Sequence, residues 1–361
     1  MDMNIVEYLN QLNFTALFLV FIISKLLIET YLKIRNISSI NENKETIPER
    51  FINVVTEEEY KKSINYNIER IRFSILTSVF GVGVLLFFTI GGMLNNLTVF
   101  VQGVTASNVI GAIFLGLLLI VIGEIIEIPL AVYSTFHIEE KYGFNKTTTK
   151  TFVTDLFKNL LIQSIFSSIL YAIVISIIEN LGNNWWIYAF IAVFLLQVII
   201  FYIYPVLILP LFNKFEPLED ERFKKPIERL LKKIEFKAKG LFVMDGSLRS
   251  SHGNAFFTGF GNNKRIVFYD TLLETITPDE MESILGHELG HYKLGHIKKT
   301  LISSIFFGFA GFYILGQVFQ SENFFYGHGL DELTIYAKFL LFYLVVGSYT
   351  FFTKPITSFI S

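Results

Sequence analysis

The chain of 361 residues contains no cysteine. This absence excludes a disulfide framework, a thiolate zinc site and a cysteine nucleophile. Charged residues are also few, at 17%, whereas 52% of the residues are hydrophobic and 16% are aromatic. The mean hydropathy is positive, at +0.51. This composition is typical of integral membrane proteins, and it excludes both a disordered chain and an ordinary soluble fold.

Lysine and arginine are missing from alternate connections between apolar runs. A helix needs roughly 20 apolar residues to cross a bilayer core, and seven candidate runs lie near residues 14–30, 73–94, 108–135, 160–178, 185–212, 300–320 and 335–353. The connections 1–13, 95–107, 179–184 and 321–334 contain no Lys or Arg, whereas 31–72, 136–159, 213–299 and 354–361 contain eight, four, fifteen and one. This alternation predicts seven membrane helices, with the amino terminus outside and residues 213–299 in the cytoplasm.

The same pattern divides the chain into three regions. We expect residues 1–212 to form five membrane helices, 213–299 a cytoplasmic catalytic domain, and 300–361 the last two membrane helices. The amino terminus has neither a basic region nor a small-residue cleavage site, so the first run is interpreted as a retained helix. The expected fold is an α-helical, multi-pass membrane protein with a small cytoplasmic α+β domain.

The cytoplasmic region shows both helical and strand periodicity. Residues 219–239 alternate charges with apolar residues at helical spacing, which predicts an amphipathic helix. Residues 240–244, 255–258 and 265–269 are predicted strands, and the last two form a hairpin across a Gly- and Asn-containing turn. A small sheet is therefore expected immediately before residue 270.

The strongest chemical signal is an H-E-x-x-H motif made by His287, Glu288 and His291. Positions four apart on an α-helix lie about 40° apart around its axis, so both imidazoles can bind one zinc ion. Glu288 would then take a proton from a metal-bound water. Residues 277–280 form a Thr-Pro-Asp-Glu capping box, which predicts where this helix begins. The alternative is an ordinary helix with two surface histidines.

The predicted hairpin has a use beside a zinc helix. Peptides often bind as an added strand at a sheet edge, through main-chain hydrogen bonds. Asn254, at the start of the hairpin, could bond to a substrate backbone; the alternative is an ordinary turn residue.

Several stretches resemble the type I CAAX prenyl endopeptidases, the membrane zinc metalloproteases that include the prelamin A and yeast a-factor converting enzymes. They are residues 249–257 (RSSHGNAFF), 264–273 (KRIVFYDTLL), 287–296 (HELGHYKLGH), 138–147 and 204–215. The resemblance implies seven helices around a chamber, a zinc ion held by His287 and His291, and Glu288 as general base. It also implies that Asn254, Ala255 and Phe256 form the substrate-binding edge strand.

Glu124 and Glu127 share one face of the third apolar run, where a charge facing lipid is costly. We favour a buried, paired structural role over a place in the chamber.

The expected function is cleavage near the carboxyl terminus of protein or peptide substrates, prenylated or not. The expected partners are that substrate and the lipid bilayer, with no nucleic acid. The expected location is a bacterial inner membrane, or the endoplasmic reticulum in a eukaryote. A broad-specificity quality-control protease, a non-proteolytic zinc hydrolase, and an inactive zinc-binding scaffold or transporter stay open as alternatives. An HtpX-type protease is disfavoured because it has far fewer membrane segments before its motif.

The resemblance also produces a prediction about zinc. The family takes its third ligand from a Glu after the last membrane helix, and residues 1–361 contain no such Glu, so that ligand is expected beyond Ser361. His296 would lie about 180° from His287 around a continuous helix and could join the site only if the helix breaks near Gly295. We predict that residues 1–361 alone hold zinc weakly and cleave little. Stoichiometric zinc after dialysis, or turnover by this chain, would contradict the prediction.

Overall fold

A computed structural model describes residues 5–234, 236, 239–258 and 264–360, with backbone alone at positions 5–10, 50, 291, 292, 296–298 and 360. The described chain forms two compact units. Unit 1 comprises residues 1–138, 162–189 and 310–360, and unit 2 comprises 139–161 and 190–309. The predicted division at residues 212 and 299 stays a prediction.

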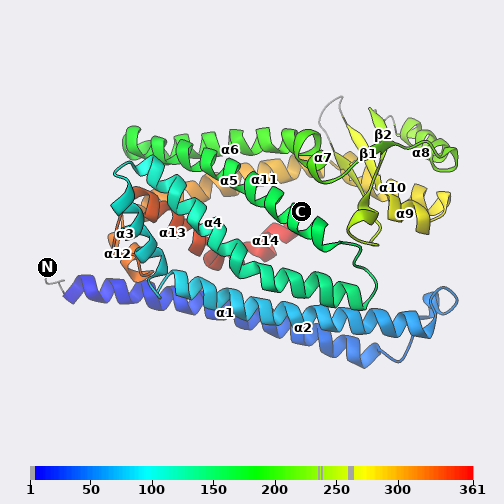
Figure 1. The fold of residues 1–361 in the computed structure, drawn as a ribbon, viewed down its shortest axis with the longest axis horizontal. Helices are drawn as coiled ribbons and strands as arrows, with labels where there is room; N and C mark the ends of the chain where they lie inside the picture. The colour runs from blue at the N-terminus through cyan, green and yellow to red at the C-terminus, as the bar shows by residue number, and fades with distance from the viewer. Residues whose placement is uncertain (1–4, 235, 237–238, 259–263, 361) are drawn as a thin grey trace. The chain divides into compact units, whose positions relative to one another are not determined.

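Seven helices among the described residues are long and apolar enough to span a membrane, which confirms the number of predicted runs. They are built from α1 (Ile5–Asn43), α2 (Glu57–Phe88), α4 (Asn108–Tyr133), α5 (Thr149–Asn180), α6 (Trp185–Ile203), α11 (His296–Val318) and α13 (Ile335–Thr350) (Figure 1). Two of them continue through π-helical segments, α4 into Ser134–Glu139 and α6 into Tyr204–Ile208 and α7 (Leu209–Phe212). The seventh helix, α13, is followed by the short helix α14 (Lys354–Ile360).

Several of these helices extend well beyond their apolar runs. The run near 73–94 belongs to a helix that already begins at Glu57, where Thr56 and Glu59 form a capping box. This box satisfies amide groups that the first helical turn leaves without partners. In unit 1, α1 and α2 lie side by side (Figure 1), and the Lys33 ammonium donates to the Ser74 carbonyl and the Ser78 hydroxyl at 3.0 and 2.7 Å.

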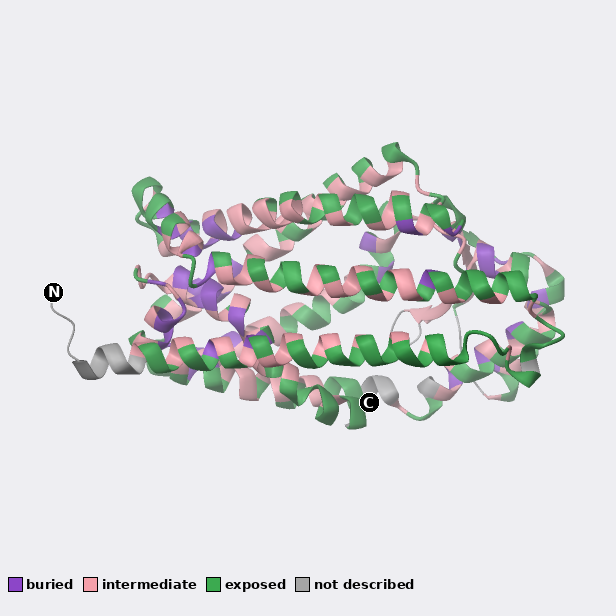
Figure 2. Ribbon diagram, turned by 90° about the horizontal axis from the view of Figure 1, so that it is seen from below, coloured by how far each residue is buried: buried purple, intermediate pink, exposed green. Residues whose placement is uncertain are grey.

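Figure 2 shows exposed residues along the long helices, and many of these residues are large and apolar. Leu27, Phe157, Leu195 and Phe306 are examples, each with more than half of its surface accessible. Contiguous exposed apolar surface of this extent is unfavourable in water and matches a hydrocarbon environment.

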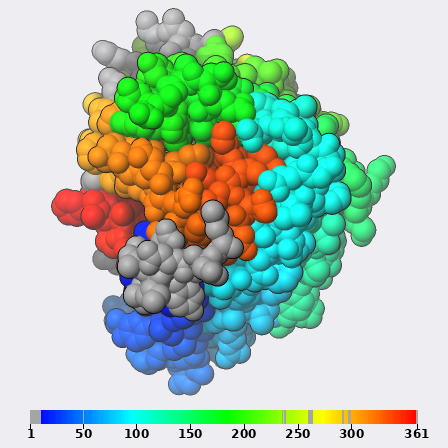
Figure 3. Space-filling model, turned by 90° about the vertical axis from the view of Figure 1, so that its left-hand side faces the viewer, coloured from blue at the N-terminus to red at the C-terminus, as the bar shows by residue number. Residues whose placement is uncertain are grey.

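Two of the connections without Lys or Arg, 95–107 and 321–334, contact each other in unit 1, and the beginning of α4 contacts a third, 179–184. The Asn95 side-chain oxygen, on α3 (Met93–Val104), accepts from the amides of Asp331 and Glu332, both at 2.9 Å. The side-chain amide of Asn108 donates to the Glu179 carboxylate at 2.8 Å. Figure 3 shows residues of the 320s and 330s against those near 100. Such contacts fit connections that lie on the same side of a membrane. The short helices α3 and α12 (Glu322–Gly327) were not predicted.

Unit 2 contains a four-stranded sheet in the order β1-β2-β4-β3. Strand β2 (Gly240–Met244) pairs parallel with β4 (Arg265–Tyr269), and β3 (Ala255–Thr258) pairs antiparallel with β4. These three strands confirm the prediction; the turn residues 259–263 lie outside the described residues. The fourth strand, β1 (Phe215–Pro217), was not predicted.

Two helices pack against this sheet through one apolar core. They are the predicted amphipathic helix α8 (Glu221–Lys233) and α10 (Pro278–Lys293), which follows the short helix α9 (Asp270–Thr275). The buried core residues are Leu218, Phe223, Ile227, Leu231, Phe236, Ile266, Phe268, Leu272, Met281, Leu285 and Leu289. The core therefore joins the helix that carries the H-E-x-x-H motif to the sheet.

Truncation of this core should destabilise unit 2. Leu285 is 1% exposed, and Leu285→Ala should lower the free energy of unfolding by about 2–5 kcal/mol because it removes buried methyl groups and leaves a cavity. Leu294→Ala, at a position 65% exposed, is the matched control and should change stability little. Thermal unfolding in detergent measures both. Equal melting temperatures for the two variants would contradict this assignment of the core.

Candidate metal centre

Helix α10 begins where the capping box predicts. The Thr277 amide and hydroxyl donate to the Glu280 carboxylate at 2.7 and 2.9 Å, and the Glu280 amide donates to the Thr277 hydroxyl at 3.4 Å. These bonds, chiefly that from the Thr277 backbone, lower the pKa of Glu280. Pro278 occupies the first helical position, where its missing N–H costs nothing. The register of the motif along the helix is thereby set from its first turn.

The buried stripe of α10 determines which residues face outward. Met281, Leu285 and Leu289 are 3% exposed or less, at a spacing of four residues. His287 lies away from this stripe and is exposed, and Glu288 is partly buried beside it. His291 follows His287 by one helical turn of backbone, and its side chain lies outside the described residues.

The helix ends two residues after His291, and this is the break near Gly295 on which a role for His296 depends. Gly295 adopts a left-handed φ of 69°, and a new helix, α11, starts at His296. The break removes the geometric objection to His296. Its side chain also lies outside the described residues, so no role follows for it.

The donor chemistry of this helix face fits zinc. Imidazole nitrogen and carboxylate oxygen are both ligands that zinc accepts in proteins. Among the described side chains no three His, Asp or Glu groups come together to hold a metal, and the His291 imidazole is not part of that set. His287 and Glu288 are thus the described members of the candidate centre.

Strand β3 lies at one edge of the described sheet, as a substrate-binding strand requires. The Tyr269 amide donates to the Asn254 carbonyl at 2.9 Å, which makes these two residues a hydrogen-bonded pair. Because such pairs alternate in antiparallel strands, the main-chain groups of Ala255 and Phe257 point to the outer edge. The main-chain groups of Phe256 then point to β4. Its ring packs edge-on against the Tyr269 ring, with 6.2 Å between ring centroids.

The Asn254 side chain forms a hydrogen bond with the next residue. Its oxygen accepts the Ala255 amide, one of the outward-facing groups, at 2.8 Å. This contact is consistent with an ordinary turn residue, and it also places the Asn254 side chain beside the open edge. The role of Asn254 in substrate binding stays a prediction.

The two glutamates of the third membrane helix are not a buried pair. Glu124 accepts from the Gln163 amide at 3.2 Å, whereas Glu127 is exposed and lines a cavity of about 570 Å³ together with Phe73, Thr77 and Leu130. Our prediction of burial was therefore wrong. Both residues are on α4, but only Glu124 has a side-chain partner in a neighbouring helix of unit 1 among the bonds described.

Comparison with known proteins identifies the family. A model described as the CAAX prenyl protease N-terminal region with five membrane helices matches residues 36–214, and the model of peptidase family M48 matches 217–358. CAAX prenyl protease 1 homolog of Arabidopsis thaliana is 34% identical over 339 residues, which are 89% of this chain and 77% of the relative. CAAX prenyl protease 1 of Saccharomyces cerevisiae is 34% identical over 329 residues, or 87% and 72%.

The chain belongs to the CAAX prenyl protease family of M48 peptidases. The crystal structure of S. mikatae Ste24p matches with a TM-score of 0.88 at 30% identity, over 96% of this chain and 85% of that one. The chain is accordingly a multi-pass membrane zinc metallopeptidase that acts on protein or peptide substrates. These matches confirm the family and the fold class predicted from the sequence.

The segment that leads into β3 takes part in an ion pair that the sequence did not predict. Arg249 and Asp155 form a close ion pair in unit 2, although 94 positions separate them in the chain. No spacing rule connects two such residues, and Arg249 stood out only as part of the stretch that resembles the family.

Proposed function

We propose that this endopeptidase cleaves prenylated substrates near their carboxyl termini, as the names of its relatives suggest, at a zinc centre on α10. One observation carries the proposal: the exposed face of α10 bearing His287 and the open-edged strand β3 belong to one packed unit. A metal and an extended peptide can therefore be held by the same core.

His287 and His291 are the proposed zinc ligands, and Glu288 is the proposed general base. A zinc ion held by these residues would supply Lewis-acid chemistry, polarising the scissile carbonyl and acidifying a water molecule at the site. The Glu288 carboxylate accepts a proton from the attacking water and returns it to the nitrogen of the leaving amine. The carbon–nitrogen bond breaks, a carbon–oxygen bond forms, and the products are a trimmed protein and a short carboxyl-terminal peptide.

The proposed substrate position is the outer edge of β3. The Ala255 and Phe257 main chain offers amide and carbonyl groups there at alternate residues, which is the pattern that an added strand needs. To use the Ala255 amide, the substrate must displace the Asn254 oxygen that now accepts it. Asn254 can then turn its amide toward the peptide.

The proposed orientation places α10 on the cytoplasmic side and the amino terminus outside. Its support is the alternation of Lys and Arg among the connections, together with the contacts between 95–107 and 321–334 and between the beginning of α4 and Glu179.

Replacement of Glu288 by Gln tests the general base. Gln has the same shape but cannot accept the proton, so E288Q should reduce kcat by roughly 10²–10⁴-fold, with zinc content and melting temperature unchanged. The assay uses the protein as its gene encodes it. Glu282→Gln, a carboxylate elsewhere on α10, is the matched control and should keep full activity. A fully active E288Q enzyme would refute the assignment.

An N-methyl scan of a substrate peptide tests strand addition. Each N-methyl group removes one main-chain donor, so affinity for E288Q protein should fall about 2–10-fold at every second residue of the bound segment and less between. Equilibrium binding of a fluorescent farnesylated peptide with a Cys-aliphatic-aliphatic-X ending measures this. A scan with no period of two would exclude β-strand addition, and equal binding of the non-farnesylated peptide would argue against recognition of the lipid.

A further inference from the structure

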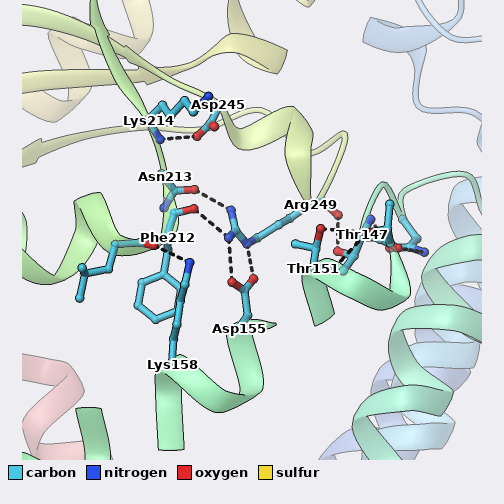
Figure 4. A network of polar contacts seen from close by, with 12 residues as sticks. Thr147, Thr151, Asp155, Lys158, Phe212, Asn213, Lys214, Asp245 and Arg249 are labelled. Carbon is cyan, nitrogen blue, oxygen red and sulfur yellow. Dashed lines mark hydrogen bonds and ion pairs between the residues drawn. The ribbon is translucent and has the colours of Figure 1, made fainter. Parts of the chain in front are cut away.

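The Arg249 guanidinium is bonded on three sides within unit 2 (Figure 4). Its Nε and Nη2 donate to the two carboxylate oxygens of Asp155, near the beginning of α5, at 2.6 and 3.0 Å. Nη2 also donates to the Phe212 carbonyl at the end of α7 at 2.8 Å, and Nη1 donates to the Asn213 side-chain oxygen at 3.0 Å. One side chain thus connects two membrane helices to the segment that leads into β3.

The main chain of the same segment is fixed to the connection between α4 and α5. The Arg249 carbonyl accepts from the Lys146 amide at 3.1 Å and from the Thr147 hydroxyl at 3.0 Å. The Ser251 amide donates to the Phe144 carbonyl at 3.1 Å, and the His252 ring stacks on Phe144 with 4.3 Å between ring centroids. Residues 249–252 therefore have little freedom to shift.

Only two residues separate this fixed segment from β3. A Cβ at Gly253 would lie 3.0–3.2 Å from atoms of Leu272, so the chain passes that residue at close range. Asn254 is already paired with Tyr269 of β4. Because the residues between them are held by these contacts, a displacement of Arg249 would also displace Ala255.

The chemistry of the contact requires arginine. A planar guanidinium can engage both oxygens of one carboxylate and two further acceptors at once, whereas a lysine ammonium is a point charge on one nitrogen. The side chains of Arg249 and Asp155 are 26% and 18% exposed, so the pair is largely removed from water. A surface pair such as Arg222 with Asp220, where Arg222 is 78% exposed, contributes far less.

We propose that Arg249 is a positioning residue for substrate binding: held by Asp155, Phe212 and Asn213, it sets where the outer edge of β3 lies. This rests on the proposed function, in which that edge binds the substrate. Arg249 touches neither the metal nor the substrate. It acts through Ala255 and Phe257.

Arg249→Lys is the direct test. It should lower kcat/KM on the order of 10–100-fold, mainly through KM, because a misplaced strand binds peptide poorly. Zinc content and melting temperature should stay close to those of the parent. In the E288Q background the alternating N-methyl penalty should disappear, which loss of stability alone would not produce. Arg222→Lys, in the same unit, is the matched control and should behave as the parent.

Asp155→Asn is a second variant that leaves the Arg249 bonds to Phe212 and Asn213 in place. It should show the same type of defect, and R249K/D155N should be no worse than the stronger single variant, since both act through one contact. If R249K matches R222K while the parent keeps its alternating scan, the inference fails and the proposed function stands. A parent without alternation overturns both. If both variants lose zinc together with peptide binding, Arg249 serves folding and the positioning role is wrong.

Discussion

The burial of one stripe of α10 is the interaction on which the candidate centre depends. Met281, Leu285 and Leu289 are enclosed by α8 and the sheet, and each such side chain contributes about 1.5–3 kcal/mol of transfer free energy. A shift of the helix by one residue would turn it by about 100° and expose all three. The rotation that presents His287 outward is therefore set by apolar packing, before any metal binds.

The same core also joins the edge strand β3 to α10, the helix of the candidate centre. Strand β4 pairs with β2 on one side and with β3 on the other, so its main chain has no free edge. Its Ile266, Val267 and Phe268 side chains are buried. The open edge nearest to it belongs to β3, whose Ala255 and Phe257 pack against the core beneath. A peptide added there would be held by the same packing that orients α10. This packing would keep the β3 edge and the candidate metal residues in a fixed relative position.

Local patterns in the sequence predicted most of this arrangement. The spacing of Phe223, Ile227 and Leu231 predicted α8, and the Thr277 capping box predicted the start of α10; both depend on residues a few positions apart. Strand β1 escaped because it has three residues, one of them Pro, which is too short for an alternation to show. Glu127 was misjudged because its surroundings depend on how α2 and α4 pack. The Arg249–Asp155 pair required tertiary structure for the same reason.

The break at Gly295 separates two helices whose apolar residues face different surroundings. Helix α10 is apolar on one stripe and must follow the core, whereas α11 carries apolar residues such as Ile302 and Phe306 that are highly exposed, as a lipid-facing helix does. A continuous helix would bind the rotation and direction of one to the other. Gly295 adopts the left-handed conformation at little cost, so α10 can end and α11 can begin with its own orientation. The rotation of the candidate metal-binding face can thus be set by the core of unit 2, although α11, a candidate membrane helix, begins at His296.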